Sequence, residues 1–298
     1  AVGDLSGVHT YGFGPAHGTL AGLPHFREAI FDGKFPTAEL RFREPDFPGE
    51  ARLTAWSPFI PGDSESASLP VAVFEITLAN STAEPLDYTA IAVLSNPWME
   101  PGGGNRVERK NGRTALRCGS VLPPDDLHYG EVTMTTDAAD VSYQQYWYRG
   151  RWQDSLEVYC KDLFTAGKFR NRVYPPREKQ LSDHSLLAAH LHLNPGVSGT
   201  VRFVLSWFVP NCAVANAPAT VAGIPNRWQN YYTRLAGNAV EAADRVWRDF
   251  EPLRTGTFGF RDALFRSTLP EKILQGVSAS LAVLKSPTCL RLEDGTFW

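Results

Sequence analysis

The first two thirds of the chain alternate apolar and polar residues, which is the pattern of strands with one buried face. In residues 37–44, Ala38, Leu40 and Phe42 share one face while charged side chains share the other. The same period predicts further strands at residues 48–59, 68–81, 87–98, 131–138, 141–150, 184–194 and 199–211. Several strands at short spacing without intervening helices favour a large antiparallel β-sandwich.

Turn residues separate these strands. The stretch 194–199 (NPGVSG) predicts a hairpin turn. Residues 99–112 contain three consecutive glycines and a mixed run of charges, without the glycine spacing of a phosphate-binding loop. We therefore expect 99–112 to be a flexible hairpin connection.

From about residue 226 the apolar residues recur at helical spacing. The pattern predicts one helix over 226–253, with Asn226 as its N-cap and Pro252 as its stop. Further helices are predicted at 258–269 and at 271–286, the last opened by Pro270. The chain should therefore consist of a β-sandwich domain, 1–225, and a helical part, 226–298. Three helices bury too little apolar surface to stand alone, so they should pack on the sandwich or begin a larger helical domain.

The two ends predict a piece of a longer polypeptide. Asp294-Gly295 is a strong turn signal, and 296–298 read as the start of a strand that has no continuation. At the other end the chain begins with Ala1 instead of Met.

Composition and charge remove several classes of function. Of 298 residues, 43% are hydrophobic and 20% are charged, which excludes general disorder. The net charge of −3 gives no attraction to nucleic acid or an anionic bilayer, and no apolar run is long enough for a transmembrane segment. The four cysteines lie far apart and lack the spacing of metal ligands. We expect scattered buried thiols; disulfides are the alternative if the compartment is oxidising. Nothing in the chain indicates a cofactor.

Several stretches together resemble glycoside hydrolase family 116, which includes bacterial β-glucosidases and non-lysosomal glucosylceramidases. The most diagnostic is LRFREPDFPGEARLTAWSPFIPGDSESASLPVAVFEITLANST, residues 40–82. VLSWFVPN, NYYTRLAGNAVEAADRV and LPEKILQGVSASLAVLKSPTC follow in the expected order at 204–211, 230–246 and 269–289. The glycine-rich opening of the family is not recognisable here.

The resemblance implies a large N-terminal β-sandwich, a linking helix and an (α/α)₆ barrel that carries the catalytic residues. Family members are retaining β-glycosidases that use a Glu nucleophile and an Asp acid/base, both beyond the position that corresponds to Trp298. No catalytic residue can therefore be assigned in this chain, and residues 226–298 would be the linker helix and the truncated beginning of the barrel. The missing barrel is the implied partner, with a glycoside as the substrate.

Other candidate chemistry is weaker. A retaining glycosidase needs two carboxyl groups about 5–5.5 Å apart, and the acidic clusters at 63–65, 125–126 and 293–294 read as solvated turns. His190 and His192 should share one strand face, with His184 as a possible third metal ligand. Because no Asp, Glu or Cys motif accompanies them, we predict ordinary sandwich residues and no metal.

The aromatic cluster at 143–152 is the best carbohydrate-contact candidate, because Trp and Tyr stack on the apolar faces of sugars. Its candidate residues are Tyr146, Trp147, Tyr148, Arg149 and Trp152. Read as a strand, Tyr146 and Tyr148 would share one face and Trp147 and Arg149 the other. Burial in the core or against the barrel is the favoured alternative to a glycan platform.

Two functions follow. The first is a non-catalytic N-terminal domain of a family 116-like β-glycosidase, inactive by itself. The alternative is a stand-alone carbohydrate-binding β-sandwich module, which would lose binding but not its fold on Trp147→Ala or Trp152→Ala.

Overall fold

The computed structural model describes residues 24–98, 100, 104–149, 155–176, 178, 183–213, 220–221, 223–286 and 289–297 of the chain. Strands dominate, and a few helices follow them near the C-terminus. The predicted mainly-β fold with C-terminal helices is confirmed.

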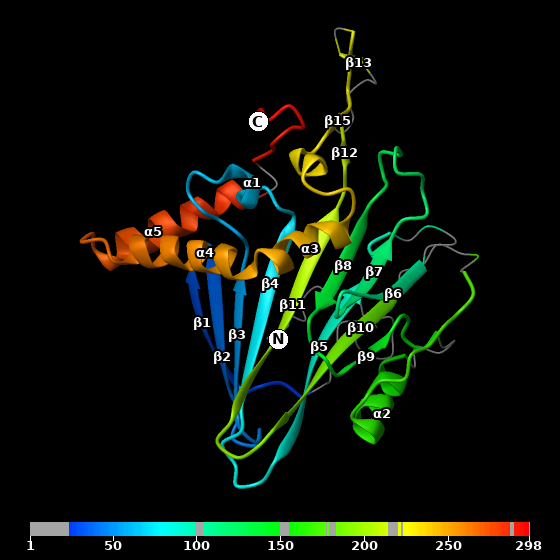
Figure 1. Ribbon diagram of the computed structural model, residues 1–298, viewed down its shortest axis with the longest axis vertical. Coiled ribbons are helices and arrows are strands. Elements are labelled where there is room, and N and C mark those ends of the chain that lie inside the picture. Colours follow the sequence, from blue (N-terminus) through cyan, green and yellow to red (C-terminus); the bar gives the residue numbers. More distant parts are fainter. Residues whose placement is uncertain are drawn as a thin grey trace, which may run out of the picture.

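Two antiparallel sheets form the sandwich (Figure 1). The larger sheet has eight strands in the order β1-β2-β3-β4-β11-β8-β7-β6. In that order they span Glu28–Lys34, Thr37–Arg43, Glu50–Trp56, Val71–Ala79, Ser198–Phe208, Glu131–Thr136, Arg113–Gly119 and Gly104–Lys110. The smaller sheet has the order β5-β10-β9, spanning Leu86–Ser95, His184–Leu193 and Val141–Gln144. Two short ribbons complete the strands: β12 (Asn211–Cys212) pairs with β15 (Trp228–Gln229), and β13 (Thr220–Val221) pairs with β14 (Ile224–Pro225).

The period-two pattern decides which side chains enter the core between the sheets. On β11, Val201 and Phe203 face the smaller sheet, where Leu187 and Ala189 of β10 meet them. Phe203 and Leu187 are almost fully buried. Removing such side chains from water is the main stabilising contribution of this layer.

The side chains on the opposite face of the large sheet pack against the helices. Val71 and Val73 of β4 and Val204 of β11 form a second core with α3 (Ala239–Arg248) and α4 (Phe250–Phe265). Figure 1 shows α3, α4 and α5 (Glu271–Leu281) lying across the strands of this sheet. The prediction that the helices pack on the sandwich is confirmed.

The helix boundaries differ from the predicted ones. Residues 226–238 hold β15 and the short 3₁₀ helix η2 (Tyr231–Arg234), and α3 begins only after Asn238. The Asn238 side chain accepts a hydrogen bond from the Glu241 backbone N–H, and Glu241 in turn accepts one from the Gly237 N–H. Asn226 as N-cap was therefore wrong. Pro252 does not stop a helix either; it lies in the first turn of α4, where its missing N–H costs nothing.

Two further predictions need correction, and one helix was missed. Residues 104–110, expected in a flexible connection, are edge strand β6 of the large sheet. The strand predicted at 141–150 ends at Gln144. The helix α2 (Ser155–Ala166) was not predicted; it packs Tyr159 against Trp147 beside the smaller sheet. Two further short helical segments, α1 (Ser64–Ala67) and the 3₁₀ helix η3 (Ala282–Lys285), lie before β4 and after α5.

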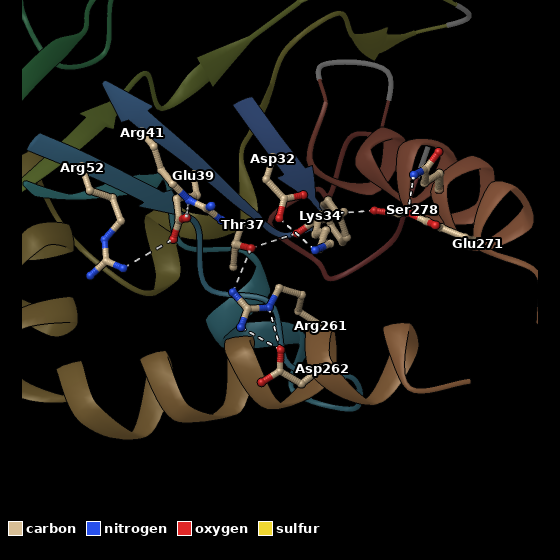
Figure 2. A network of polar contacts seen from close by, with 12 residues as sticks. Asp32, Lys34, Thr37, Glu39, Arg41, Arg52, Arg261, Asp262, Glu271 and Ser278 are labelled. Carbon is tan, nitrogen blue, oxygen red and sulfur yellow. Dashed lines mark hydrogen bonds and ion pairs between the residues drawn. The ribbon is translucent and has the colours of Figure 1, made fainter. Parts of the chain in front are cut away.

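Polar contacts fix the helices to the edge of the large sheet (Figure 2). The Arg261 guanidinium of α4 donates to the Thr37 hydroxyl, which donates to the Lys34 carbonyl. The Ser278 hydroxyl of α5 accepts the Phe35 backbone N–H at 2.8 Å. These side chains hold the turn between β1 and β2 against the helices, which identifies the network as a structural contact.

Candidate functional site

The acidic clusters are turn residues. Asp63 caps α1 by accepting the Ser66 backbone N–H. Asp126 accepts the His128 N–H at 2.8 Å, and Asp294 accepts the Thr296 N–H at 2.9 Å. Hydrogen bonds from Thr296 hold the pKa of Asp294 below its usual value. A carboxylate that serves its own turn in this way is poorly placed for acid–base catalysis, which agrees with the predicted turns.

The histidines of β10 have ordinary protein partners. The two ring nitrogens of His190 lie 2.9 Å from the Thr89 hydroxyl and 2.8 Å from the Ser142 hydroxyl. Burial lowers the pKa of His190, which favours the neutral ring. His192 contacts Asp87, and the His184 ring packs against Trp147. Among the described residues, no three or more His, Cys, Asp or Glu side chains gather as a metal ion would require.

The aromatic candidates lie mostly inside the protein. Tyr146 is 6% exposed and Trp147 is 4% exposed, and Trp147 stacks on Tyr159 at 4.6 Å between ring centroids. The Tyr146 hydroxyl accepts the Asn105 backbone N–H of β6. Because the strand has ended, the two neighbouring rings are both buried instead of pointing to opposite faces.

Arg149 is occupied as well. Its guanidinium forms a two-point ion pair with Asp183 at 3.0 and 3.1 Å. The same group lies 4.4 Å from the ring centroid of Tyr146 and 4.9 Å from that of Tyr174. Among the described candidates, only Tyr148 has an open ring, at 38% exposure. Trp152 lies outside the described residues.

An open cleft lies elsewhere, at the end of the sandwich where the C-terminal hairpin returns (Figure 1). Its volume is about 830 Å³. The walls come from the segment 59–70, η2, η3 and residues 289–297. Sequence reasoning missed this cleft because its walls are far apart in the chain; the only local signals are the turn at Asp294-Gly295 and the apolar η3.

Two cations line the cleft. The Arg291 guanidinium lies 3.4 Å from the Tyr231 ring centroid and 5.2 Å from that of Phe297. It donates to the Ser64 carbonyl and the Ser68 hydroxyl, both at 2.9 Å. The Lys285 ammonium donates to the carbonyls of Ala67 and Pro58 at 2.6 and 3.4 Å. Burial lowers the pKa of Lys285 to about 8.

The four cysteines are free thiols. Cys118 is fully buried and burial raises its pKa to about 12, which removes it as a nucleophile. Cys289 lies in the wall of the cleft without an activating histidine among the lining residues. The thiols are scattered as expected, but only Cys118 is buried; Cys160, Cys212 and Cys289 are partly exposed.

Comparison with known proteins decides the family. The family model described as "beta-glucosidase 2, glycosyl-hydrolase family 116 N-term" matches residues 11–252. The chain belongs to glycosyl-hydrolase family 116. No match was found among curated protein sequences.

Two solved structures that match this family 116 chain have low sequence identity to it. A putative kojibiose phosphorylase from the human microbiome matches with 8% identity and a TM-score of 0.38, over 77% of this chain and 23% of that one. A polysaccharide lyase matches with 13% identity and a TM-score of 0.32, over 57% and 21%. The chain therefore spans less than a quarter of either neighbour, and at these values neither bears on its function.

The family 116 match covers the whole sandwich and ends inside the first turn of α4. The cleft lies on both sides of that limit: the segment 59–70 and η2 are within the match, whereas η3 and the hairpin 289–297 follow it. No helix in the described ranges is both long and apolar enough to cross a membrane.

Proposed function

We propose that this chain is the non-catalytic N-terminal part of an enzyme that hydrolyses β-glycosides with retention of configuration. The observation that carries the proposal is the match of residues 11–252 to an N-terminal domain of family 116. The catalytic Glu and Asp would lie beyond residue 298. The turn roles of the acidic clusters at 63–65, 125–126 and 293–294 support this placement.

The proposed division is a sandwich domain over 1–225 and, over 226–298, a linker helix with the beginning of a helical catalytic domain. The exposed side of α5 and η3 supports the second part. Leu274 and Ser278 are buried toward the sheet, whereas Ile273 is 53% and Val283 is 52% exposed. A shallow groove of about 520 Å³ runs along this apolar row. Further helices of the same polypeptide would cover it.

Turnover of an aryl β-glucoside tests the catalytic half of the proposal. The purified chain 1–298 should give no turnover, because a retaining site needs two opposed carboxyl groups that the described turns do not provide. The longer polypeptide, expressed from the same reading frame, should hydrolyse the substrate and release the β-anomer first. Activity of 1–298 by itself, free of contaminants, would contradict the proposal.

A paired substitution tests the interface with the helical domain. Ile273→Glu should leave the thermal stability of 1–298 unchanged, because the side chain is exposed there. In the longer polypeptide the same change would bury a charge and should lower the melting temperature and activity. Val173→Glu, at a position 74% exposed outside the helices, is the matched control. Equal effects of Ile273→Glu on both polypeptides would refute the interface.

A stand-alone carbohydrate-binding module is the second candidate, and the open cleft at the C-terminal hairpin is what favours it. Trp147→Ala does not test it, since this ring is 4% exposed and its removal would leave a core cavity. A stop codon directly after residue 298 would favour this candidate over the first.

A further inference from the structure

We propose that the cleft between the segment 59–70 and the C-terminal hairpin is a saccharide subsite that holds one pyranose ring. The choice of ligand class rests on the proposed function, whereas the site itself rests on geometry. At about 830 Å³ the cleft has the size of small-molecule sites in proteins. Most of its lining is apolar, with a few convergent polar groups.

The aromatic part of the site is the stack of Tyr231, Arg291 and Phe297. The guanidinium carbon lies 3.4 Å from the Tyr231 ring centroid and 5.2 Å from that of Phe297. The Phe297 ring is nevertheless 62% exposed, so it offers an open aromatic surface at the cleft. The axial C–H groups of a pyranose pack on such a surface, because they are apolar and the ring face carries negative charge density.

Hydrogen-bond donors complete the recognition. Lys285 has three N–H donors, of which the carbonyls of Ala67 and Pro58 take two. A sugar hydroxyl or carboxylate oxygen would accept the third.

The charges in the lining favour an acidic sugar. The cleft holds two cations, Lys285 and Arg291, and one carboxylate, Asp63. Asp63 already accepts hydrogen bonds from the backbone N–H and the hydroxyl of Ser66. The net positive charge should therefore attract a uronate more strongly than a neutral glucoside.

Binding to the purified chain 1–298 tests the site. Methyl β-glucuronide and methyl β-glucoside would be titrated separately and followed by ligand-observed NMR. We expect saturable binding, tighter for the glucuronide. Tighter binding of the glucoside would overturn the charge argument and assign the site to neutral glucosides; no saturable binding of either sugar would overturn the subsite.

Matched variants place the binding. Phe297→Ala removes only an exposed ring and should weaken binding about tenfold. Phe164→Ala, at a ring 72% exposed on α2, should leave binding unchanged. Arg291→Lys keeps the charge but loses the planar stack, and should also weaken binding. Binding that survives Phe297→Ala and Arg291→Lys, or that falls equally in Phe164→Ala, would overturn the location.

The two proposals fail separately. Absence of binding by 1–298 together with β-glucoside turnover by the longer polypeptide would remove the subsite alone. Binding by 1–298 with an inactive longer polypeptide would remove the catalytic assignment and leave the subsite standing.

Discussion

At the scale of single residues, Lys285 shows how burial and charge interact in this chain. Its ammonium contacts two backbone carbonyls, and neither brings a negative charge. Carbonyl dipoles compensate a buried cation only partly, so the neutral amine is favoured and the pKa falls from 10.5 to about 8. The residue therefore couples the cleft to pH.

The contribution of Lys285 to stability should rise with pH in a defined window. Between pH 8 and 10.5 the folded chain carries fewer protons at Lys285 than the unfolded chain, so this group alone increases the free energy of unfolding with pH. The full increase is on the order of 3 kcal/mol. Cys118, whose pKa is raised by burial, acts in the opposite direction above pH 9, so the Lys285 contribution is the difference between the natural chain and Lys285→Met. Urea denaturation at pH 7.5, 9.0 and 10.0 would measure it.

Lys285→Met is the control for this pH dependence. Its baseline stability differs because two hydrogen bonds are lost, but the Lys285-dependent increase with pH should disappear. Parallel pH curves for the natural chain and Lys285→Met would show that Lys285 is not the group responsible.

At the scale of elements, the start of α3 is set by a capping box. Asn238 caps the backbone N–H of Glu241, and the Glu241 carboxylate accepts the N–H of Gly237 at 2.8 Å. Glu131 of β8 also accepts the first N–H of the helix, from Ala239. These contacts place a negative charge at the positive end of the helix dipole.

Asn238→Ala should destabilise the chain by about 1 kcal/mol, because one backbone N–H in the first turn of the helix loses its partner. Asn238→Ser should keep most of the stability, since serine caps equally well and, unlike aspartate, places no second carboxylate beside Glu241, whose Oε1 accepts the Asn238 amide at 2.8 Å. Chemical denaturation of the two variants gives the comparison. An equal loss in both would show that the side-chain amide, and not the cap, matters.

The sequence contains this capping signal. The helical spacing of the apolar residues continues before it, so the spacing alone does not show where the helix begins. Asn-Ala-Val-Glu at 238–241 is a capping-box pattern, whereas the apolar residues at 231 and 235 extend the helical spacing backward. Tyr231 and Leu235 fit that spacing for other reasons: Tyr231 stacks on Arg291, and Leu235 packs in the core under α3. Most strands with one buried face were predictable, although β7 was missed despite its buried residues. The edge strand β6 was not predictable, because most of its side chains face water.

The candidate site was less predictable than the fold. Tyr146 and Trp147 are neighbours, and alternation would send them to opposite faces, yet both are buried. Only the tertiary position of α2 and the loop around Tyr174 explains this. The cleft was even less predictable from the sequence, because it brings together Ser64, Tyr231 and Arg291, which are spread over more than half of the chain.

At the scale of the whole molecule, a buried polar contact joins the sheet to the helical layer. Glu75 of β4 accepts the Trp56 indole N–H and the Arg254 Nε, both at 2.8 Å. Its side chain is 8% exposed, so the charge depends on these partners. The contact links β3, β4 and α4.

Glu75→Gln should lower the free energy of unfolding by about 2 kcal/mol, because charge-assisted hydrogen bonds become neutral ones. Glu108→Gln, whose ion pairs lie at the surface of β6, should change it by less than about 0.5 kcal/mol. Urea denaturation of both variants is the measurement. Equal effects would mean that the contact of Glu75 with α4 adds nothing to stability.

The contacts between the large sheet and its helices determine where two such chains can be joined into a chimera. Trp56 contacts Phe250 and Phe258, on either side of residue 252, where the family match ends. In a chimera joined at residue 252, Phe250 would come from this chain and the residue at position 258 from the other parent. One of the two aromatic contacts of Trp56 would therefore be replaced. The segment 266–270, between α4 and α5, is the better junction, because the whole of α3 and α4 then travels with the strands beneath them.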